Sequence, residues 1–165
     1  MYHFIKDFVQ EWQNESANTL KVMQQLSDNS LQQRVTPQGR SLGRIAWHIV
    51  QSFNDMAGRM GLPVEAPRED APIPAQAKGI ADSYAAAAES LAKAVQTWSD
   101  ADLQIEDNMY GEMWKRGVTL QILINHEIHH RGQMTVLLRQ AGLQVPGVCG
   151  PSAEEWSQFG MPAQE

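Results

Sequence analysis

Apolar residues recur at steps of three and four along several stretches of the chain, and this spacing places them on one face of an α-helix. The first stretch covers residues 4–23 and ends before the turn-forming residues of SDNSLQQRVTPQGR. A second runs from residue 42 to about residue 60, with Ser41 as its expected N-cap. A third covers residues 80–98 and is rich in alanine, whose small side chain lets a neighbouring helix approach closely.

The segments between and after these helices have different patterns. GLPVEAPREDAPIP holds four of the eight prolines and is expected to be an extended connection. Periodicity fails over residues 100–118, where NMYGEMWKRG could form a loop or a short hairpin with Tyr110 and Trp114 as anchors. A fourth helix is expected from near Thr119 to Gly142, since glycine is common just past a helix C-terminus.

Together these elements predict an all-α fold, a four-helix bundle with long connections that forms a single domain of residues 1–165. The C-terminal tail, QVPGVCGPSAEEWSQFG, is expected to pack on the bundle, with a short helix around residues 152–156. Four aromatic residues could line a pocket, although aromatic side chains at helical spacing usually belong to the core: Trp12, Trp47, Tyr110 and Trp114.

Composition narrows the possible partners. The net charge is −6 and the 13 Lys and Arg residues are scattered, which argues against binding nucleic acid and favours a small-molecule substrate. The single cysteine, Cys149, cannot form an internal disulfide, and the N-terminus lacks the pattern of a signal peptide, so we expect a cytoplasmic protein. No apolar run reaches the roughly 20 residues that cross a bilayer, so no membrane association is expected.

The sequence HEIHH lies within the fourth predicted helix and suggests a metal site. His126 and His130 are about 40° apart around a helix, so both can reach one ion. Glu127 and His129 point about 80° to either side of the direction midway between the two histidines, so neither is aimed at that ion. The neighbouring turns on the histidine face are mostly apolar, so the pair faces the bundle interior. Buried histidines can instead be hydrogen-bonded core residues, but two at this spacing make a metal an equally good explanation.

His48, on the second predicted helix, is the candidate third ligand. It lies at the edge of the apolar stripe, where it could point toward a neighbouring helix or remain half exposed as an ordinary polar residue. Three imidazoles with an open fourth position are typical of catalytic zinc. Zinc is therefore the expected metal, with nickel, iron or manganese as alternatives.

The same five letters also match the HExxH motif of zinc peptidases, in which the glutamate acts as general base. The longer form of that motif fails here, because Gly132 comes one place early and Val136 stands where a third histidine is required. The chain also offers no convincing edge strand to pair with a peptide substrate. A peptidase or other metal-dependent hydrolase is therefore the least favoured alternative.

The strings SLGRIAWHIVQSF, TLQILINHEIHHRGQ and VPGVCGPSAEEW closely resemble the DinB-like family, also called the DinB/YfiT superfamily, over nearly the whole chain. This resemblance implies a bacterial, frequently dimeric four-helix bundle, with a metal held by one histidine of the second helix and two of the last. It thus assigns His48, His126 and His130 as metal ligands. It also implies metal-dependent transfer of a low-molecular-weight thiol such as bacillithiol, mycothiol or glutathione, although many members have no assigned activity.

The expected function is therefore a metal-dependent thiol transferase, with a homodimer as the expected assembly. Glu127 and Gln133 are weak candidates for catalytic roles: Glu127 is more simply explained as a surface residue paired with Arg131, and Gln133 is better placed to orient a ligand. Cys149 stands where an aromatic residue is usual in the family, and is more simply a small filling residue than a reactive thiol. The alternative is a non-catalytic metal-binding or stress-response module.

Overall fold

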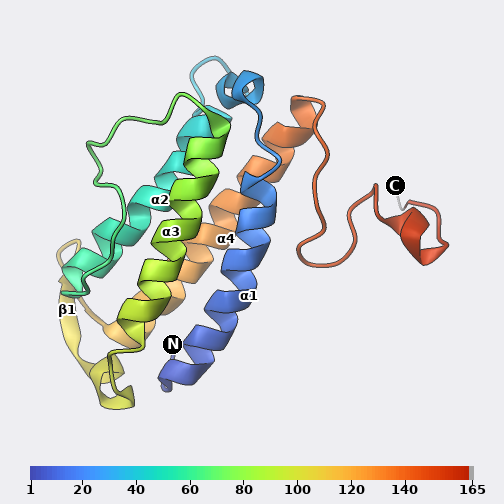
Figure 1. The fold of residues 1–165 in the computed structure, drawn as a ribbon. Helices are drawn as coiled ribbons and strands as arrows, with labels where there is room; N and C mark the ends of the chain where they lie inside the picture. Colours follow the sequence, from blue (N-terminus) through green and yellow to red (C-terminus); the bar gives the residue numbers. More distant parts are fainter. Residues whose placement is uncertain (164–165) are drawn as a thin grey trace.

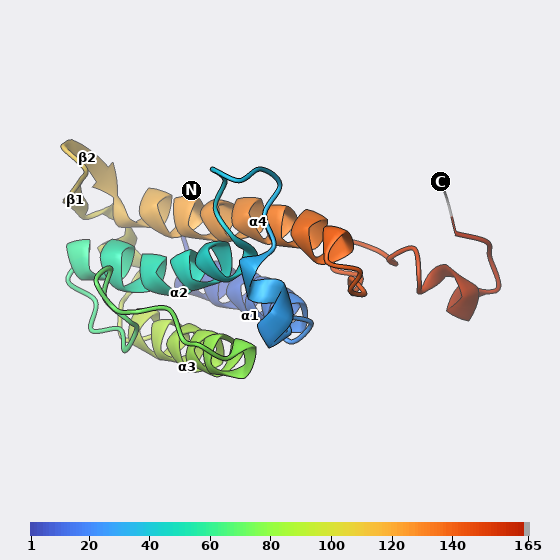
Figure 2. The same ribbon diagram turned by 90° about the horizontal axis from the view of Figure 1, so that it is seen from above.

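The computed structural model describes residues 1–163 and contains four long helices arranged as a bundle (Figures 1 and 2). The helices are α1 (Ile5–Met23), α2 (Leu42–Arg59), α3 (Ala77–Val95) and α4 (Arg116–Gln140). Helix α4 packs against α1 and α2, and α3 packs against the same two helices on the other side. The predicted four-helix bundle is confirmed. Among the described residues, no helix is both long and apolar enough to span a membrane.

Aromatic side chains of the first two helices form the centre of the core. Phe8, Trp12 and Phe53 are buried, and the rings of Trp12 and Phe53 meet edge to face with centroids 5.3 Å apart. Trp12 Nε1 also donates a hydrogen bond to the carbonyl of Ala88 at 3.0 Å, which links α1 to α3. Of the four aromatic residues considered as pocket walls, Trp12 is therefore a core residue.

Helix α2 begins where the sequence predicts, because the Ser41 hydroxyl accepts the backbone N–H of Arg44 at 3.2 Å. The proline-rich connection after α2 follows this helix and is fixed to it by two side chains. Gln51 Nε2 donates to the carbonyl of Arg68 at 2.8 Å, and Trp47 Nε1 donates to the carbonyl of Ala71 at 3.0 Å. Trp47 thus anchors the connection.

Helix α3 begins and ends three residues earlier than its pattern predicts. Its first N–H, on Ala77, donates to Asp28 Oδ1 at 2.7 Å, so a residue of the short helix η1 (Asp28–Gln32) caps it. The chain leaves the helix after Val95, where Thr97 Oγ1 donates to the carbonyl of Ala94. A cap supplied from 49 residues away cannot be inferred from local periodicity.

The segment before α4 forms a hairpin, one of the two predicted alternatives. After η2 (Asp100–Gln104), strands β1 (Glu106–Met109) and β2 (Glu112–Lys115) pair antiparallel. Tyr110 and Gly111 form the turn with φ of +59° and +98°, as a two-residue type I′ turn requires. Strand β2 continues directly into α4, which therefore begins before the predicted Thr119.

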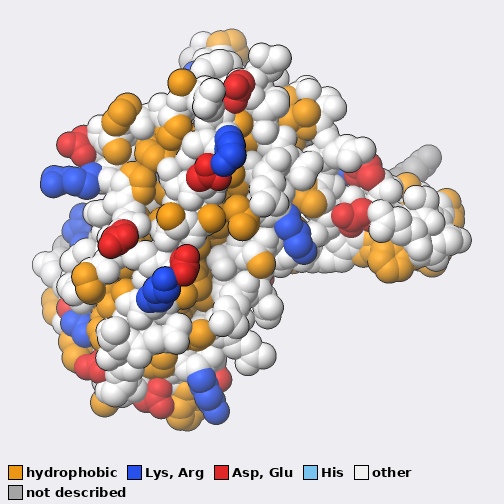
Figure 3. Space-filling view, viewed as in Figure 1, with side chains coloured by type: hydrophobic (Ala, Val, Ile, Leu, Met, Phe, Trp, Pro, Cys, Tyr) orange, Lys and Arg blue, Asp and Glu red, His pale blue; other side chains and the backbone are white. Residues whose placement is uncertain are grey.

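The tail packs on the bundle over its first part, and further along Glu154 forms an ion pair with Arg139 of α4. Val145 is buried, and Asn18 Nδ2 of α1 donates to the carbonyl of Val148. The chain then leads away, and η3 (Trp156–Phe159) stands to one side of the four helices (Figures 1 and 2). The short helix predicted around residues 152–156 forms a few residues later. The space-filling view shows the same projection, with Lys, Arg, Asp and Glu dispersed over this face (Figure 3).

Candidate metal centre

Helices α2 and α4 bring three histidines together. His126 Nε2 lies 3.1 Å from His48 Nε2 and 3.1 Å from His130 Nε2. One ring nitrogen from each residue lies within 4.8 Å of the other two, and among the described residues no second group of three or more His, Cys, Asp or Glu side chains is arranged in this way. His130 is 7% exposed, and the other two rings are half-buried. The three histidines could therefore hold a metal ion.

The donor set fits a cation better than it fits a set of ordinary hydrogen bonds. A neutral imidazole carries one N–H, so the Nε2 of His126 can act as donor to only one of its two close neighbours. At least one pair of converging nitrogens then lacks a normal hydrogen bond. An ion accepting three lone pairs removes this conflict, and imidazole nitrogen is a common ligand of zinc and other transition metals.

Gln133 orients one of these rings. His130 Nδ1 lies 2.8 Å from Gln133 Oε1, and because an amide oxygen only accepts, the proton of neutral His130 is on Nδ1. Its Nε2 lone pair is then directed at the other two histidines. Gln133 Nε2 in turn lies 3.0 Å from His129 Nε2. The structure thus places Gln133 next to the site, as expected for a residue that orients a ligand.

Burial keeps the histidines neutral. Desolvation, followed by the charge of His130, lowers the pKa of His48 to about 4. Desolvation and the neighbouring histidines lower the pKa of His126 to about 4, and desolvation also lowers the pKa of His130. All three side chains are therefore free of a competing proton at neutral pH, which metal binding requires.

Two cavities adjoin the cluster. The first, of about 390 Å³, is reached by His48 and His126, and is also lined mainly by polar and charged residues: Arg40, Arg44, Gln51, Asp55, Arg59, Glu69 and Tyr110. The second, of about 550 Å³, is reached by His130, and its apolar lining consists of Val35, Ile45, Val136 and Leu137. Arg40 lines both. The three histidines thus lie between a charged cavity and a largely apolar one.

The hairpin turn closes one side of the charged cavity. Tyr110 Oη donates to Asp55 Oδ2, Arg59 Nε pairs with Asp55 Oδ1 at 2.9 Å, and the Arg59 guanidinium lies 4.3 Å from the centre of the Tyr110 ring. Burial, followed by the Asp55 interaction, raises the pKa of Tyr110 to about 12, so the hydroxyl remains a donor. Tyr110 is a pocket wall as considered from the sequence, whereas Trp114 packs behind it with centroids 5.9 Å apart.

The expectation that Glu127 is a surface residue paired with Arg131 is wrong. Glu127 is 0% exposed, and its Oε1 accepts a 2.8 Å hydrogen bond from Tyr84 Oη of α3. Arg131 is also buried and pairs instead with Glu15 of α1, with Nη2 and Oε2 2.6 Å apart. Burial raises the pKa of Glu127 to about 7. Glu127 therefore faces α3 rather than α2, which removes it from the position that a peptidase base requires.

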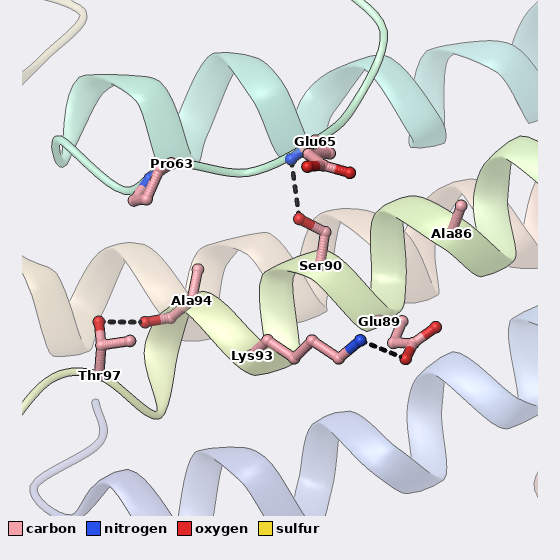
Figure 4. A pocket seen from close by; sticks show the side chains of 8 residues that line it. All are labelled: Pro63, Glu65, Ala86, Glu89, Ser90, Lys93, Ala94 and Thr97. Atoms are coloured by element: carbon pink, nitrogen blue, oxygen red, sulfur yellow. Dashed lines mark hydrogen bonds and ion pairs between the residues drawn. The ribbon is translucent and has the colours of Figure 1, made fainter.

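Other candidate features lie away from this centre. A hollow of about 430 Å³ between the proline-rich connection and α3 has no histidine, and its polar groups satisfy one another: Ser90 Oγ accepts the N–H of Glu65, and Lys93 pairs with Glu89 (Figure 4).

Cys149 is exposed in the tail, so it does not fill the core as expected. His129 is exposed and does not join the cluster of three.

Fold and site together define a four-helix protein with a three-histidine cluster on two facing helices. A sequence profile of the DinB family matches residues 1–164. The uncharacterized protein YrdA of Bacillus subtilis is 44% identical over 164 residues, which make up 99% of this chain and 98% of that protein. The chain belongs to the DinB family, and the resemblance inferred from its sequence is confirmed.

Solved structures agree with this assignment. A DinB-like protein from Bacillus cereus is 44% identical and superposes with a TM-score of 0.86, over 90% of this chain and 99% of that one. The DinB-like protein YjoA of Bacillus subtilis has the same fold at 18% identity, with a TM-score of 0.67 over 86% of this chain and 97% of that one.

Proposed function

We propose that this protein is a metal-dependent transferase that activates a low-molecular-weight thiol, of the bacillithiol, mycothiol or glutathione type, for attack on a small electrophile. The observation that carries the proposal is the position of the three histidines between two cavities of different character. A reaction between two small molecules needs space for both beside one centre. A purely structural metal site is usually closed by a fourth protein ligand instead.

His48, His126 and His130 would hold the metal, with zinc as our first choice and nickel, iron or manganese as alternatives. When bound, such an ion lowers the pKa of a coordinated thiol and so provides a nucleophilic thiolate near neutral pH. In the reaction, the S–H proton passes to solvent, sulfur bonds to the electrophilic carbon, and the leaving group departs with its electron pair. Gln133 fixes the tautomer of His130, and the apolar cavity receives the body of the electrophile.

Turnover of thiols tests the proposal directly. Zinc-loaded protein should conjugate glutathione, cysteine or bacillithiol to 1-chloro-2,4-dinitrobenzene or monobromobimane, and His126→Ala should lose this activity. A large metal-dependent rise in melting temperature without turnover of any thiol would instead favour a non-catalytic metal-binding or stress-response module. We do not propose a peptidase, because Glu127 is engaged by Tyr84.

We further propose that the protein acts as a cytoplasmic homodimer on small molecules. The family resemblance supports the dimer, and the single exposed Cys149 is compatible with a reducing compartment. The mass of the protein in solution, measured by light scattering during gel filtration, tests the assembly. A monomer at micromolar concentration would contradict it.

A further inference from the structure

Two arginines beside the histidines are not neutralised by the protein. Arg40 precedes α2 and Arg44 lies in its first turn, and both line the charged cavity together with His48 and His126. Arg44 Nη1 donates to Gln51 Oε1 at 3.2 Å, so a neutral amide holds this guanidinium in place. Among residues 1–163, neither arginine forms an ion pair with a carboxylate.

The charge of this cavity is opposite in sign to that of the whole protein. The chain carries −6 overall, yet three arginines and two carboxylates line the cavity. Arg59 is paired with Asp55, which leaves Arg40 and Arg44 against the exposed Glu69. A divalent ion at the histidines would add further positive charge. Uncompensated guanidinium groups of this kind favour binding of a carboxylate or phosphate, which they can engage through paired hydrogen bonds.

We propose that Arg40 and Arg44 form an anion-binding subsite next to the three-histidine centre, so that the cosubstrate entering this cavity carries a carboxylate or phosphate group. This inference rests on the proposed function for the identity of the cosubstrate, a thiol, but the subsite itself depends only on the arginines. The cavity, of about 390 Å³, has the size of a small-molecule site. An anionic thiol would present its charged group to the arginines and its sulfur to the histidines.

Anion binding to the metal-free protein tests the subsite without any turnover. Succinate and inorganic phosphate are titrated separately by calorimetry, which distinguishes the two anion classes. At least one should bind, and the double variant Arg40→Gln/Arg44→Gln should bind it at least about tenfold more weakly, since hydrogen bonds between charged groups are involved. Arg68→Gln is the control for charge, matched to the single variant Arg40→Gln, because it removes one positive charge from a side chain that is 82% exposed and does not line the cavity.

Loss of the hydrogen bond from Arg44 to Gln51 could impair folding of the double variant. The single variant Arg40→Gln avoids this, because Arg40 is exposed. This single variant should also weaken anion binding, with an unchanged circular dichroism spectrum. Equal affinity of wild type and both variants, or no binding of either anion to the wild type, would overturn the proposal.

A thiol comparison separates this inference from the proposed function. Cobalt-loaded protein is titrated with mercaptosuccinate and with neutral 2-mercaptoethanol, and thiolate binding is followed by the sulfur-to-cobalt absorption band. Mercaptosuccinate should bind at least tenfold more tightly, and Arg40→Gln/Arg44→Gln should abolish that preference. Equal binding of both thiols, unchanged in the variant, would reject the anion subsite and leave thiol activation intact. Absence of the band with either thiol, alongside arginine-dependent succinate binding, would reject thiol activation and support the subsite.

Discussion

The hydroxyl of Tyr84 on α3 donates a 2.8 Å hydrogen bond to the carboxylate of Glu127 on α4, directly beside the candidate metal ligand His126 in sequence but on a different side of the helix. Helix α4 therefore uses polar residues on two faces. His126 and His130 meet His48 of α2, whereas Glu127 and Arg131 are buried against α3 and α1.

Removing the Tyr84 hydroxyl should reduce stability without removing the metal. In Tyr84→Phe, the carboxylate of Glu127 loses its partner while its other oxygen, Oε2, already has none. We expect a loss of about 1–3 kcal/mol in the free energy of unfolding, measured by urea denaturation, because a buried acceptor is left unsatisfied. Metal content should stay at the wild-type level in this variant and in Glu127→Gln. A strong loss of metal from Glu127→Gln would contradict the assigned role.

Substitution of any one of the three clustered histidines should strongly weaken metal binding. For His48→Ala, His126→Ala or His130→Ala we expect at least about a hundredfold loss of zinc affinity in competition with a chromogenic chelator, since even removal of a ligand's supporting partner costs roughly 10–100-fold. His129→Ala is the matched control, because His129 is exposed and outside the cluster. Equal affinity of His48→Ala and His129→Ala would show that α2 contributes no ligand.

Gln133 should affect metal binding through His130. Gln133→Ala removes the acceptor that fixes the His130 tautomer, so zinc affinity should fall by roughly 10–100-fold. Gln133→Glu retains an acceptor and should keep affinity close to wild type. The nuclear magnetic resonance signal of the His130 Nδ1 proton provides a second readout, and its persistence in Gln133→Ala would argue against this hydrogen bond.

The depressed pKa values of His48 and His126 define a pH dependence. Their folded-state pKa values of about 4 lie below the ordinary value of 6.5, so unfolded chains bind protons more readily than folded ones. The stability that the neutral rings contribute is therefore present above pH 6.5 and is lost as the pH falls toward 4. Unfolding of metal-free protein between pH 4 and 8 should show this decline, and His48→Gln should reduce its slope. An identical pH dependence of the free energy of unfolding in wild type and His48→Gln would contradict this prediction.

Much of the four-helix fold and of the three-histidine site could be predicted from the sequence, because both depend on local periodicity. The helical spacing of His126 and His130 places both on one face, and Ser41 caps α2 as its residue type suggests. The direction of the His48 side chain does not follow from helical spacing, because His48 lies at the edge of the apolar stripe of α2. Only the packing of α2 on α4 fixes its direction.

The features that the sequence predicts wrongly depend on contacts between segments far apart in the chain. Glu15 pairs with Arg131 across 116 positions, so no local pattern could show that Glu127 and Arg131 are buried. The cap of α3 by Asp28 is equally remote. The role proposed for Arg40 and Arg44 depends on the cavity that they line together with His48 and His126, which only the folded chain brings together. A Glu and an Arg four residues apart are typical of a solvent-exposed helix face, so the sequence alone favours that interpretation of Glu127 and Arg131.

On one side of α4, Glu127 and Arg131 bind Tyr84 of α3 and Glu15 of α1, and on another side its histidines face α2. Only one rotation of the helix about its axis satisfies both sets of polar side chains. A rotation of α4 by one residue, about 100°, would leave the buried carboxylate of Glu127 without its hydrogen bond and point the imidazoles away from His48. The rotation that turns the three histidines toward α2 is thus set jointly by several polar side chains outside the cluster, so that loss of a single one leaves the histidine face in place. Attempts to transplant the three histidines into another bundle should carry Tyr84, Glu127, Arg131 and Glu15 with them.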